Sequence, residues 1–268
     1  MSHRQYPQLL RNYLVFCECR GRLLTSGRID LGPVSFVYPT TLLPIAILMK
    51  KTNKPLYLDD KDVAGYIRTM LKQADMPPSG KSYVPLVRLP EDQRNCEGVL
   101  ARVYSLKDST KLFSLNKMAY MYLLSELVDN IYQHSEFGFA YVMAQMYKTK
   151  GFIELDFLDD GITIPGSFNK HTNENFGEDK HCEAIMKAMN GASTKKDTLR
   201  GFGLCSTMKI LKALDGQALI VSGSGAVFTD SARDIPYILH EKHKLDGTLI
   251  SLRMRDADRS IDIYKYVE

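Results

Sequence analysis

The amino-acid sequence predicts an α/β fold, and two observations carry this prediction. Segments with strand character alternate with helical segments from Arg28 onward, which is typical of layered α/β proteins. The second half of the chain contains longer elements of both kinds, separated by glycine-marked turns. The length of 268 residues and the hydrophobic content of 44% permit a sizeable core, in one large domain or two modest ones.

The N-terminal half is predicted to alternate short strands and helices. The elements are, in order, a strand at 28–31 (RIDL), an extended segment at 34–38 (VSFVY), an apolar helix after Pro39 (TLLPIAILMKK), a strand at 55–58 (PLYL) and a helix at 62–73 (DVAGYIRTMLKQ). Residues 75–98 hold Met-Pro-Pro-Ser-Gly, two further prolines and mixed charge, which indicates a linker around one strand, SYVPLVRL. We therefore expect a small α/β domain at 1–80, a linker at 81–110 and a second domain at 111–268.

The second domain is predicted to begin with a long helix, from about Leu115 to His134. The elements expected after it are strands at AYVMAQMYK and FIELDFLDD, helices near 180–189 and from Gly203 to Leu214, and strands at ALIVSG, GAVFTD and TLISLRMR. The sequence Ser-Gly-Ser-Gly at 222–225 indicates a hairpin between two of these strands.

Composition excludes several classes of function. Lys and Arg number 35 and Asp and Glu 31, and they are spread along the chain, so no segment predicts contact with nucleic acid. The five cysteines form no CxxC pair, which indicates reduced thiols in a cytoplasmic protein. The most apolar run, Thr41–Met49, is far shorter than the roughly 20 residues that span a bilayer, so we expect no membrane partner.

The long helix carries the first candidate site residues. Glu126, Asn130 and His134 recur every four residues, at the edge of one apolar stripe formed by Tyr120, Leu123, Leu124, Leu127 and Ile131. An amide and a carboxylate at such an edge need polar partners, and a hydrated Mg²⁺ with a phosphate would supply them. Asn130 suits a Mg²⁺ ligand and Glu126 a group that orients water. The alternative is an ordinary amphipathic helix whose polar residues border the core.

Two glycine-containing segments add further candidates. Asp159 ends an apolar strand two residues before Gly161, where a fixed acceptor can read a purine amino group; the alternative is a plain Asp-Gly turn. Gly201 and Gly203 precede a helix, so backbone N–H groups are available to a phosphate, with Lys195 and Arg200 in the same loop. No GxxxxGK[ST] motif is present, which excludes a Walker-type loop.

Four segments taken in order resemble the GHKL ATPase superfamily of gyrases, histidine kinases and MutL proteins. They are ELVDNIYQH, DDGITIP, RGFGL and the Asp-Gly-Thr at 246–248, and the resemblance covers about 112–255. It implies a Bergerat-type α/β sandwich, a mixed sheet with helices on one face, with ATP between the helices and a lid. It also implies Mg²⁺ and ATP as cofactors.

The resemblance also implies residue roles. Glu126 resembles the general base, Asn130 the ligand of the Mg²⁺ on the ATP phosphates, Asp159 the adenine reader, Gly161 the turn beneath the base and Thr248 a hydroxyl that supports Asp159. The remaining residues of the implied nucleotide-binding set are Ile164, Lys195, Arg200, Gly201, Phe202, Gly203 and Leu204. The match departs at Thr163, where the family usually has glycine, and at Cys205-Ser206, which replaces a glycine-leucine pair.

The N-terminal half resembles a STAS domain, the fold of anti-sigma-factor antagonists. The resemblance rests on IDLGPVSFVYPTTLLPIAILMKKTNKPLYL, in which Thr40 and Thr41 lie near the position of the phosphorylatable serine, although the usual Asp-Ser pair is absent. The alternative is a strand-helix-strand unit that packs on the ATP domain.

Three functions follow from these resemblances. The first is a regulatory protein that binds Mg-ATP, hydrolyses it slowly as a lid orders, and controls a protein partner. The second is a protein serine/threonine kinase that acts on a STAS-type partner. The third is a non-catalytic nucleotide-binding interaction module. The expected ligands are ATP and ADP, and the expected partner is a protein, with a homodimer among the options.

Overall fold

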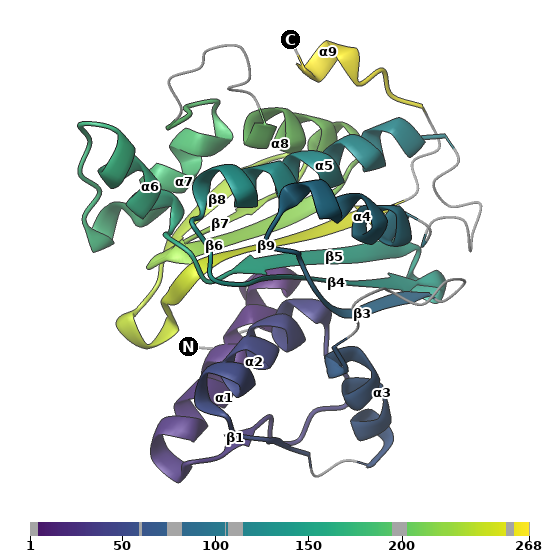
Figure 1. The fold of residues 1–268 in the computed structure, drawn as a ribbon, viewed down its shortest axis with the longest axis vertical. Helices are drawn as coiled ribbons and strands as arrows, with labels where there is room; N and C mark the ends of the chain where they lie inside the picture. The colour runs from purple at the N-terminus through teal and green to yellow at the C-terminus, as the bar shows by residue number, and fades with distance from the viewer. Residues whose placement is uncertain are drawn as a thin grey trace.

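The structure is a computed structural model that describes residues 5–58, 61–73, 82–104, 106, 115–194, 203–255 and 260–267. Its centre is a seven-stranded sheet in the order β3-β4-β5-β9-β6-β7-β8 (Figure 1). The strands are β3 (Tyr83–Arg88), β4 (Ala140–Tyr147), β5 (Phe152–Asp159), β6 (Gln217–Gly223), β7 (Gly225–Thr229), β8 (Asp234–Ile238) and β9 (Leu245–Arg255).

All neighbouring strands of this sheet are antiparallel, so the expectation of a mixed sheet is wrong for the described residues. The physical reason lies in the position of the last strand. β5 and β6 run parallel to each other, as a helical crossover requires, but β9 lies between them and is antiparallel to both.

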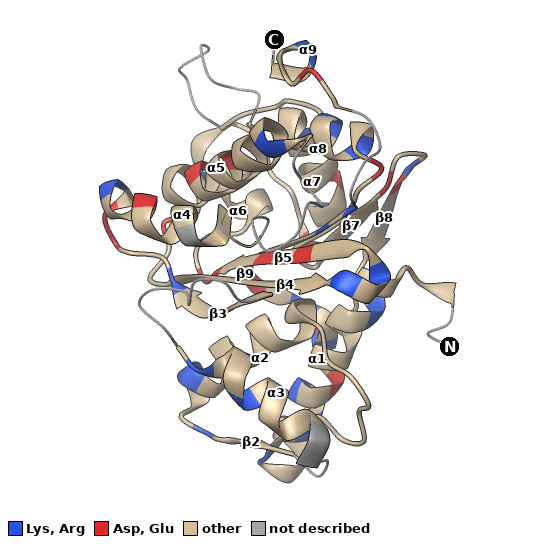
Figure 2. Cartoon of the chain, turned by 90° about the vertical axis from the view of Figure 1, so that its right-hand side faces the viewer, with Lys and Arg blue, Asp and Glu red and all other residues tan. Residues whose placement is uncertain are grey.

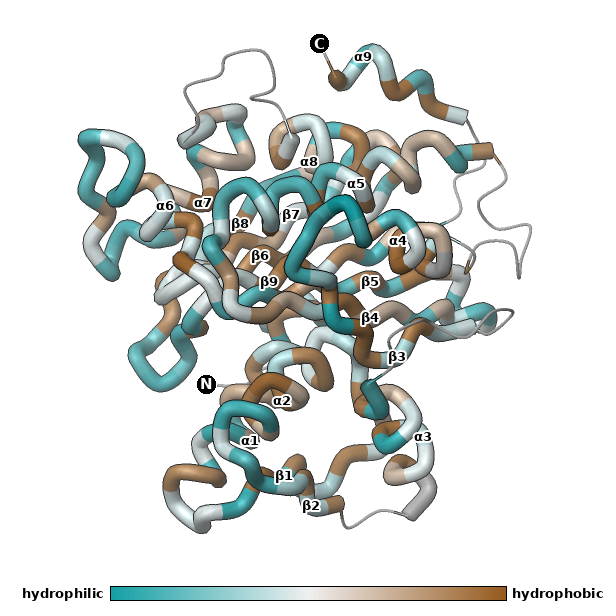
Figure 3. The backbone as a smooth tube through the Cα atoms, in the orientation of Figure 1, coloured by the Kyte–Doolittle hydropathy of each residue, from teal (hydrophilic) through white to brown (hydrophobic). Residues whose placement is uncertain are grey.

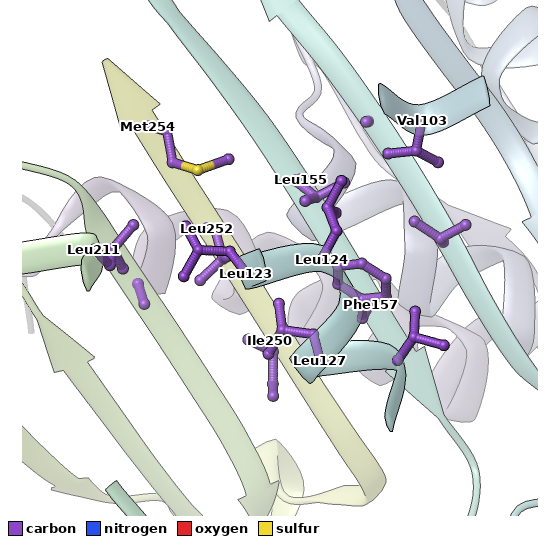
Figure 4. Close-up of a cluster of buried hydrophobic side chains, with 14 of the residues drawn as sticks. Val103, Leu123, Leu124, Leu127, Leu155, Phe157, Leu211, Ile250, Leu252 and Met254 are labelled. Carbon is purple, nitrogen blue, oxygen red and sulfur yellow. The ribbon is translucent and has the colours of Figure 1, made fainter. Parts of the chain in front are cut away.

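One face of the sheet, the upper one in Figure 1, is covered by helices of the second half of the chain and by α4. They are α4 (Glu97–Tyr104), α5 (Lys117–His134), α6 (Ile164–His171), α7 (His181–Met189) and α8 (Gly203–Ala213). The predicted apolar stripe of α5 is buried in the core of this layer. Figure 4 shows Leu123, Leu124 and Leu127 directed toward side chains of β5 and β9. Each such leucine contributes about 1.5–3 kcal/mol through burial.

The lower face of the sheet is covered by the N-terminal helices, so the whole chain has helices on both faces (Figure 1). These helices are α1 (Gln8–Ser26), α2 (Pro39–Thr52) and α3 (Lys61–Leu71). Figure 3 shows the hydrophobic character of α2, whose buried residues share one core with residues of β4, β5 and β6. The expected helix after Pro39 is thus confirmed, whereas α1 was not predicted.

The expected strands of the N-terminal half are much reduced. β1 (Ile29–Asp30) and β2 (Leu56–Tyr57) have two residues each and pair in parallel. The segment 34–38, predicted as extended, forms no strand. Its aromatic residues instead meet the β4–β5 turn, where the Lys150 ammonium lies 5.1 Å from the centroids of both the Phe36 and Tyr38 rings.

The contact between the start of α2 and the sheet is formed by polar, buried side chains. Glu154 of β5 accepts hydrogen bonds from the Thr40 backbone N–H (3.2 Å), the Thr40 hydroxyl (2.7 Å) and Arg253 Nε (2.7 Å). Figure 2 shows acidic residues in the middle of β5. Thr41 Oγ1 donates to the Asn12 carbonyl at 2.8 Å. Both threonines are buried, so neither hydroxyl faces solvent in this conformation.

The elements of the second half mostly follow the prediction. The long helix, the strand pair β4–β5 and the β6–β7 hairpin with its Ser222–Gly225 pairing are confirmed. α6 and β8 were not predicted. The predicted linker supplies an edge strand, β3, in which Pro85 lies at a register shift, as expected for proline at a sheet edge. The proposed division into 1–80, 81–110 and 111–268 stays a prediction.

Among the described residues, no helix combines the length and the apolar character that crossing a bilayer requires.

Candidate functional site

A cavity of about 780 Å³ lies on the upper side of the sheet, between α5, α6, α7 and the first turn of α8. This volume is in the range of small-molecule sites. Seven of the residues predicted from sequence line it: Glu126, Asn130, Asp159, Ile164, Gly203, Leu204 and Thr248. Four segments that are distant in sequence therefore meet at one cavity.

The other predicted residues lie elsewhere. Gly161 belongs to the turn behind Asp159 and does not line the cavity. Lys195, Arg200, Gly201 and Phe202 lie outside the described residues.

The α5 wall of the cavity presents Glu126 and Asn130. The Asn130 Nδ2 atom is buried and has no hydrogen-bond partner among the described residues. Leaving such a group unpaired costs about 1–3 kcal/mol, so a ligand with an acceptor would stabilise this wall. Gly203 contacts both residues: a Cβ added there would lie 2.6 Å from Glu126 Oε2 and 3.4 Å from the Asn130 amide. A side chain at this position would displace Glu126.

Asp159 is the buried acid of the site, with 3% of its surface exposed. Its Oδ1 atom accepts a hydrogen bond from the Gly161 N–H at 3.0 Å. Burial, with a smaller effect from the charge of Asp160, raises the pKa of Asp159 to about 7. A donor from a ligand would favour the ionised form of this carboxyl. The next residue has a structural role, since Asp160 Oδ1 accepts from the Gly138 and Phe139 N–H groups.

Gly161 holds the turn against the end of α5. The Ile162 N–H donates to the Ser135 carbonyl at 2.6 Å, and a Cβ added at Gly161 would lie only 1.9 Å from that same oxygen. Glycine is required here for close backbone approach. The turn therefore fixes Asp159 relative to Glu126 and Asn130.

The role expected for Thr248 takes a different form. Thr248 pairs with Asp159 across β9 and β5, but its hydroxyl is hydrogen-bonded to Ser222 Oγ at 2.9 Å. Ser222 Oγ also accepts from the Ile164 N–H at 2.8 Å. Within the described part of the chain, Thr248 thus supports the turn after Asp159 through Ser222. Sequence reasoning missed Ser222, which is fully buried in β6.

Thr163, where the sequence departs from the resembled family, begins a helix. Its Oγ1 atom accepts from the Gly166 N–H at 3.0 Å, which caps α6. α6 then supplies Ser167 and Phe168 to the cavity. The departure from glycine therefore has a structural reason in this chain.

Replacing Thr163 with alanine is expected to lower the free energy of unfolding by about 1 kcal/mol, because the cap is lost while the backbone can remain in place. Urea denaturation of the variant measures this loss. Thr163→Ser keeps a capping hydroxyl and is the matched control. Equal losses in both variants would contradict a capping role.

Two further polar residues of the cavity, His134 and Thr194, were given no role by the sequence-based prediction. His134 Nδ1 lies 3.0 Å from Thr194 Oγ1, which lies 3.1 Å from Ser167 Oγ. The four-residue spacing from Asn130 was a signal for His134, but nothing in the sequence pointed to Thr194. Val267 of α9 (Tyr264–Val267) also lines the cavity. The segment before α9 is held to the residue preceding α5, because the Ile261 N–H donates a hydrogen bond to Asn116 Oδ1 at 2.9 Å.

Compared with known proteins, the chain matches neither a model of a protein family nor a curated protein.

Proposed function

We propose that this chain is a Mg-ATP-binding regulatory protein of the GHKL type. The observation that carries the proposal is the meeting of Glu126, Asn130, Asp159, Gly203 and Thr248 at one cavity, because these residues come from the four segments that resemble the family.

The residues of the cavity fit a nucleotide in three respects. A buried acceptor, Asp159, suits the amino group of adenine. The unpaired Nδ2 of Asn130 suits an acceptor such as a phosphate oxygen, and the amide oxygen of the same side chain suits a phosphate-bound Mg²⁺, which prefers oxygen ligands and needs few from the protein. The N-terminus of α8 at Gly203 presents backbone N–H groups, which favour phosphate. When bound, Mg²⁺ would neutralise phosphate charge; the protein would bind and orient the nucleotide.

Glu126 is the group we assign to the activation of water. It lines the cavity next to Gly203 and Asn130. Slow hydrolysis would then end a nucleotide-bound state that a protein partner recognises. Phosphorylation of this chain's own Thr40 or Thr41 is disfavoured, because both hydroxyls are buried and hydrogen-bonded.

Glu126→Gln is expected to retain ATP binding and to reduce phosphate release by at least about 100-fold, since general-base catalysis is lost while the shape of the side chain is kept. Calorimetry measures affinity, and a phosphate assay measures turnover on the same samples. Glu97→Gln makes the same chemical change at an exposed position of α4 and should leave both unchanged. ATP binding without phosphate release in the wild type would favour the non-catalytic module.

A further inference from the structure

Residues 260–267 form a short segment that reaches the cavity from its outer side. The floor of the cavity comes from the sheet, which supplies Asp159 and Thr248. α9 lies on the other side of α5 and α8 from the sheet, as Figures 1 and 2 both show. Val267 of α9 nevertheless lines the cavity. We name residues 260–267 the α9 strap, because they connect the start of α5 to the cavity.

The strap is anchored at its beginning to the two residues that precede α5. The Ile261 N–H donates to Asn116 Oδ1 at 2.9 Å, and Ser260 Oγ donates to the Leu115 carbonyl at 3.3 Å. Asn116 is the N-cap residue of α5, a position where an asparagine side chain usually accepts from the first turn of its own helix. Within the described part of the chain it makes no such bond. The side-chain oxygen of this buried residue therefore holds the strap instead.

The rest of the strap is held by apolar contacts. Ile261, Ile263, Tyr266 and Val267 are partly buried against the core between the sheet and the helices of its upper face, and α9 packs on α8. α9 has only four residues, and so short a helix is not stable without tertiary contacts. The strap thus depends on few contacts and can open while the layer beneath it stays folded.

Val267 lies on the α8 side of the cavity, because α9 packs on α8. α8 contributes Gly203 and Leu204 to the lining, and both belong to its first turn, where backbone N–H groups favour phosphate. An apolar side chain offers no hydrogen bond to a phosphate oxygen, and burying a charged group against it is costly. The docked strap and a bound nucleotide therefore compete for this side of the cavity.

We infer that the α9 strap is an autoinhibitory segment that occupies one side of the nucleotide cavity and has to move away when a nucleotide enters. This inference rests on the proposed function, because the charge of the phosphates is what makes the strap a competitor. Displacement of the strap also exposes Ile261, Ile263 and Tyr266, so a protein partner meets a different apolar surface in each state. The coupling is reciprocal: a substitution that favours the open strap favours nucleotide binding by the same factor.

The test is the affinity of the full chain for Mg-ATP, measured by calorimetry in variants of the strap. Ile263→Ala weakens docking without altering the cavity, because Ile263 packs on the core but does not line the cavity. We expect it to lower the Kd of Mg-ATP by about 10-fold, as the open fraction of the strap rises. An unchanged or higher Kd in a folded Ile263→Ala variant would overturn the inference.

Tyr264→Ala is the matched control. Tyr264 is the neighbouring residue in the strap, its side chain is 70% exposed, and it does not line the cavity. This variant should keep the wild-type Kd, and a decrease equal to that of Ile263→Ala would also overturn the inference. If Ile263→Ala does not fold, Asn116→Ala decides, since it removes the acceptor of the Ile261 N–H. A lower Kd is expected there as well, and an unchanged Kd contradicts the strap.

Hydrogen exchange of the Ile261 amide, followed by NMR, reports the position of the strap directly. Saturating Mg-ATP should accelerate this exchange in the wild type, because the bond to Asn116 Oδ1 is broken when the strap leaves. Slower exchange in the presence of Mg-ATP would show that the strap closes over the nucleotide, which would contradict an inhibitory role.

The affinities separate this inference from the proposed function. Equal binding of Mg-ATP by the wild type and by the strap variants would overturn the strap and leave the proposed function standing. Absence of binding in the wild type and in every strap variant would remove the proposed function, and the inhibitory role with it. Binding by the strap variants alone would support both.

Discussion

Asp159→Asn is expected to abolish ATP binding and at the same time to stabilise the folded protein above neutral pH. Affinity should fall by at least about 100-fold, because an unsuitable polar group would face the adenine amino group. Asp159 Oδ1 already accepts from the Gly161 N–H. An asparagine that keeps this bond would turn its amide donor toward the base, where donor would meet donor.

The gain in stability follows from the pKa of Asp159. Its value of about 7 in the folded protein lies above its ordinary value of 3.8. Between these two pH values the folded state keeps a proton that the unfolded state has released, so stability falls as pH rises through this window. Asparagine does not titrate. At pH 8 the variant should therefore unfold with a free energy higher by on the order of 3 kcal/mol.

Urea denaturation at pH 5 and pH 8, together with calorimetry of ATP binding, measures both effects. The difference in stability between variant and wild type should be larger at pH 8. A variant that is less stable than the wild type at pH 8 would show that the Asp159 carboxylate stabilises the folded protein. Unchanged ATP affinity would remove Asp159 from the nucleotide site.

Gly161→Ala is expected to lower the free energy of unfolding by about 3 kcal/mol or more. The new Cβ would lie 1.9 Å from the Ser135 carbonyl oxygen and 3.1 Å from the Phe137 nitrogen. Both are backbone atoms, so the steric clash can be relieved only if the turn and the end of α5 move apart. ATP binding should weaken as well, because that turn positions Asp159.

Gly65→Ala in α3 is the matched control. Gly65 is exposed in the helix, and an added Cβ meets nothing within 4 Å. Since alanine favours helix over glycine by about 1 kcal/mol, this variant should be as stable as the wild type or more so. A Gly161→Ala variant that unfolds with a free energy within about 0.5 kcal/mol of the wild type would contradict the required close approach.

Sequence reasoning succeeded where local patterns are strong. The helical spacing of Leu123, Leu124 and Leu127 predicted α5 and its buried face, because that spacing is a property of the helix itself. The strand that ends at Asp159 was predicted from its run of apolar residues, which is also a local pattern. The expectation that Glu126, Asn130 and Asp159 face a common site came from the resemblance, and these residues do line one cavity.

The failures concern features that depend on tertiary packing. α1 carries apolar residues at helical spacing, such as Leu10, Tyr13 and Leu14, so a signal existed; its place under the sheet is set by the need to cover that face. The aromatic residues at 34–38 favour a strand locally, but they contact Lys150 from a distant turn instead. Nothing in the local sequence of β5, β6 or β9 indicates that β9 lies between the other two strands.

One site feature also depends on tertiary packing. Ser222 supports the turn after Asp159 from a strand 58 residues beyond Ile164. Ser222 belongs to no motif of the resembled family, so no pattern in the sequence identified this role.

The measurement that tests the central claim most directly is the calorimetric titration of the wild-type protein with ATP, with and without Mg²⁺. Inosine triphosphate, which lacks the amino group of adenine, is the matched ligand control. We expect saturable, Mg²⁺-dependent binding of one ATP per chain, with inosine triphosphate bound at least about 100-fold more weakly. No binding of ATP, or equal binding of both nucleotides, would contradict the assignment of this cavity to adenine nucleotides.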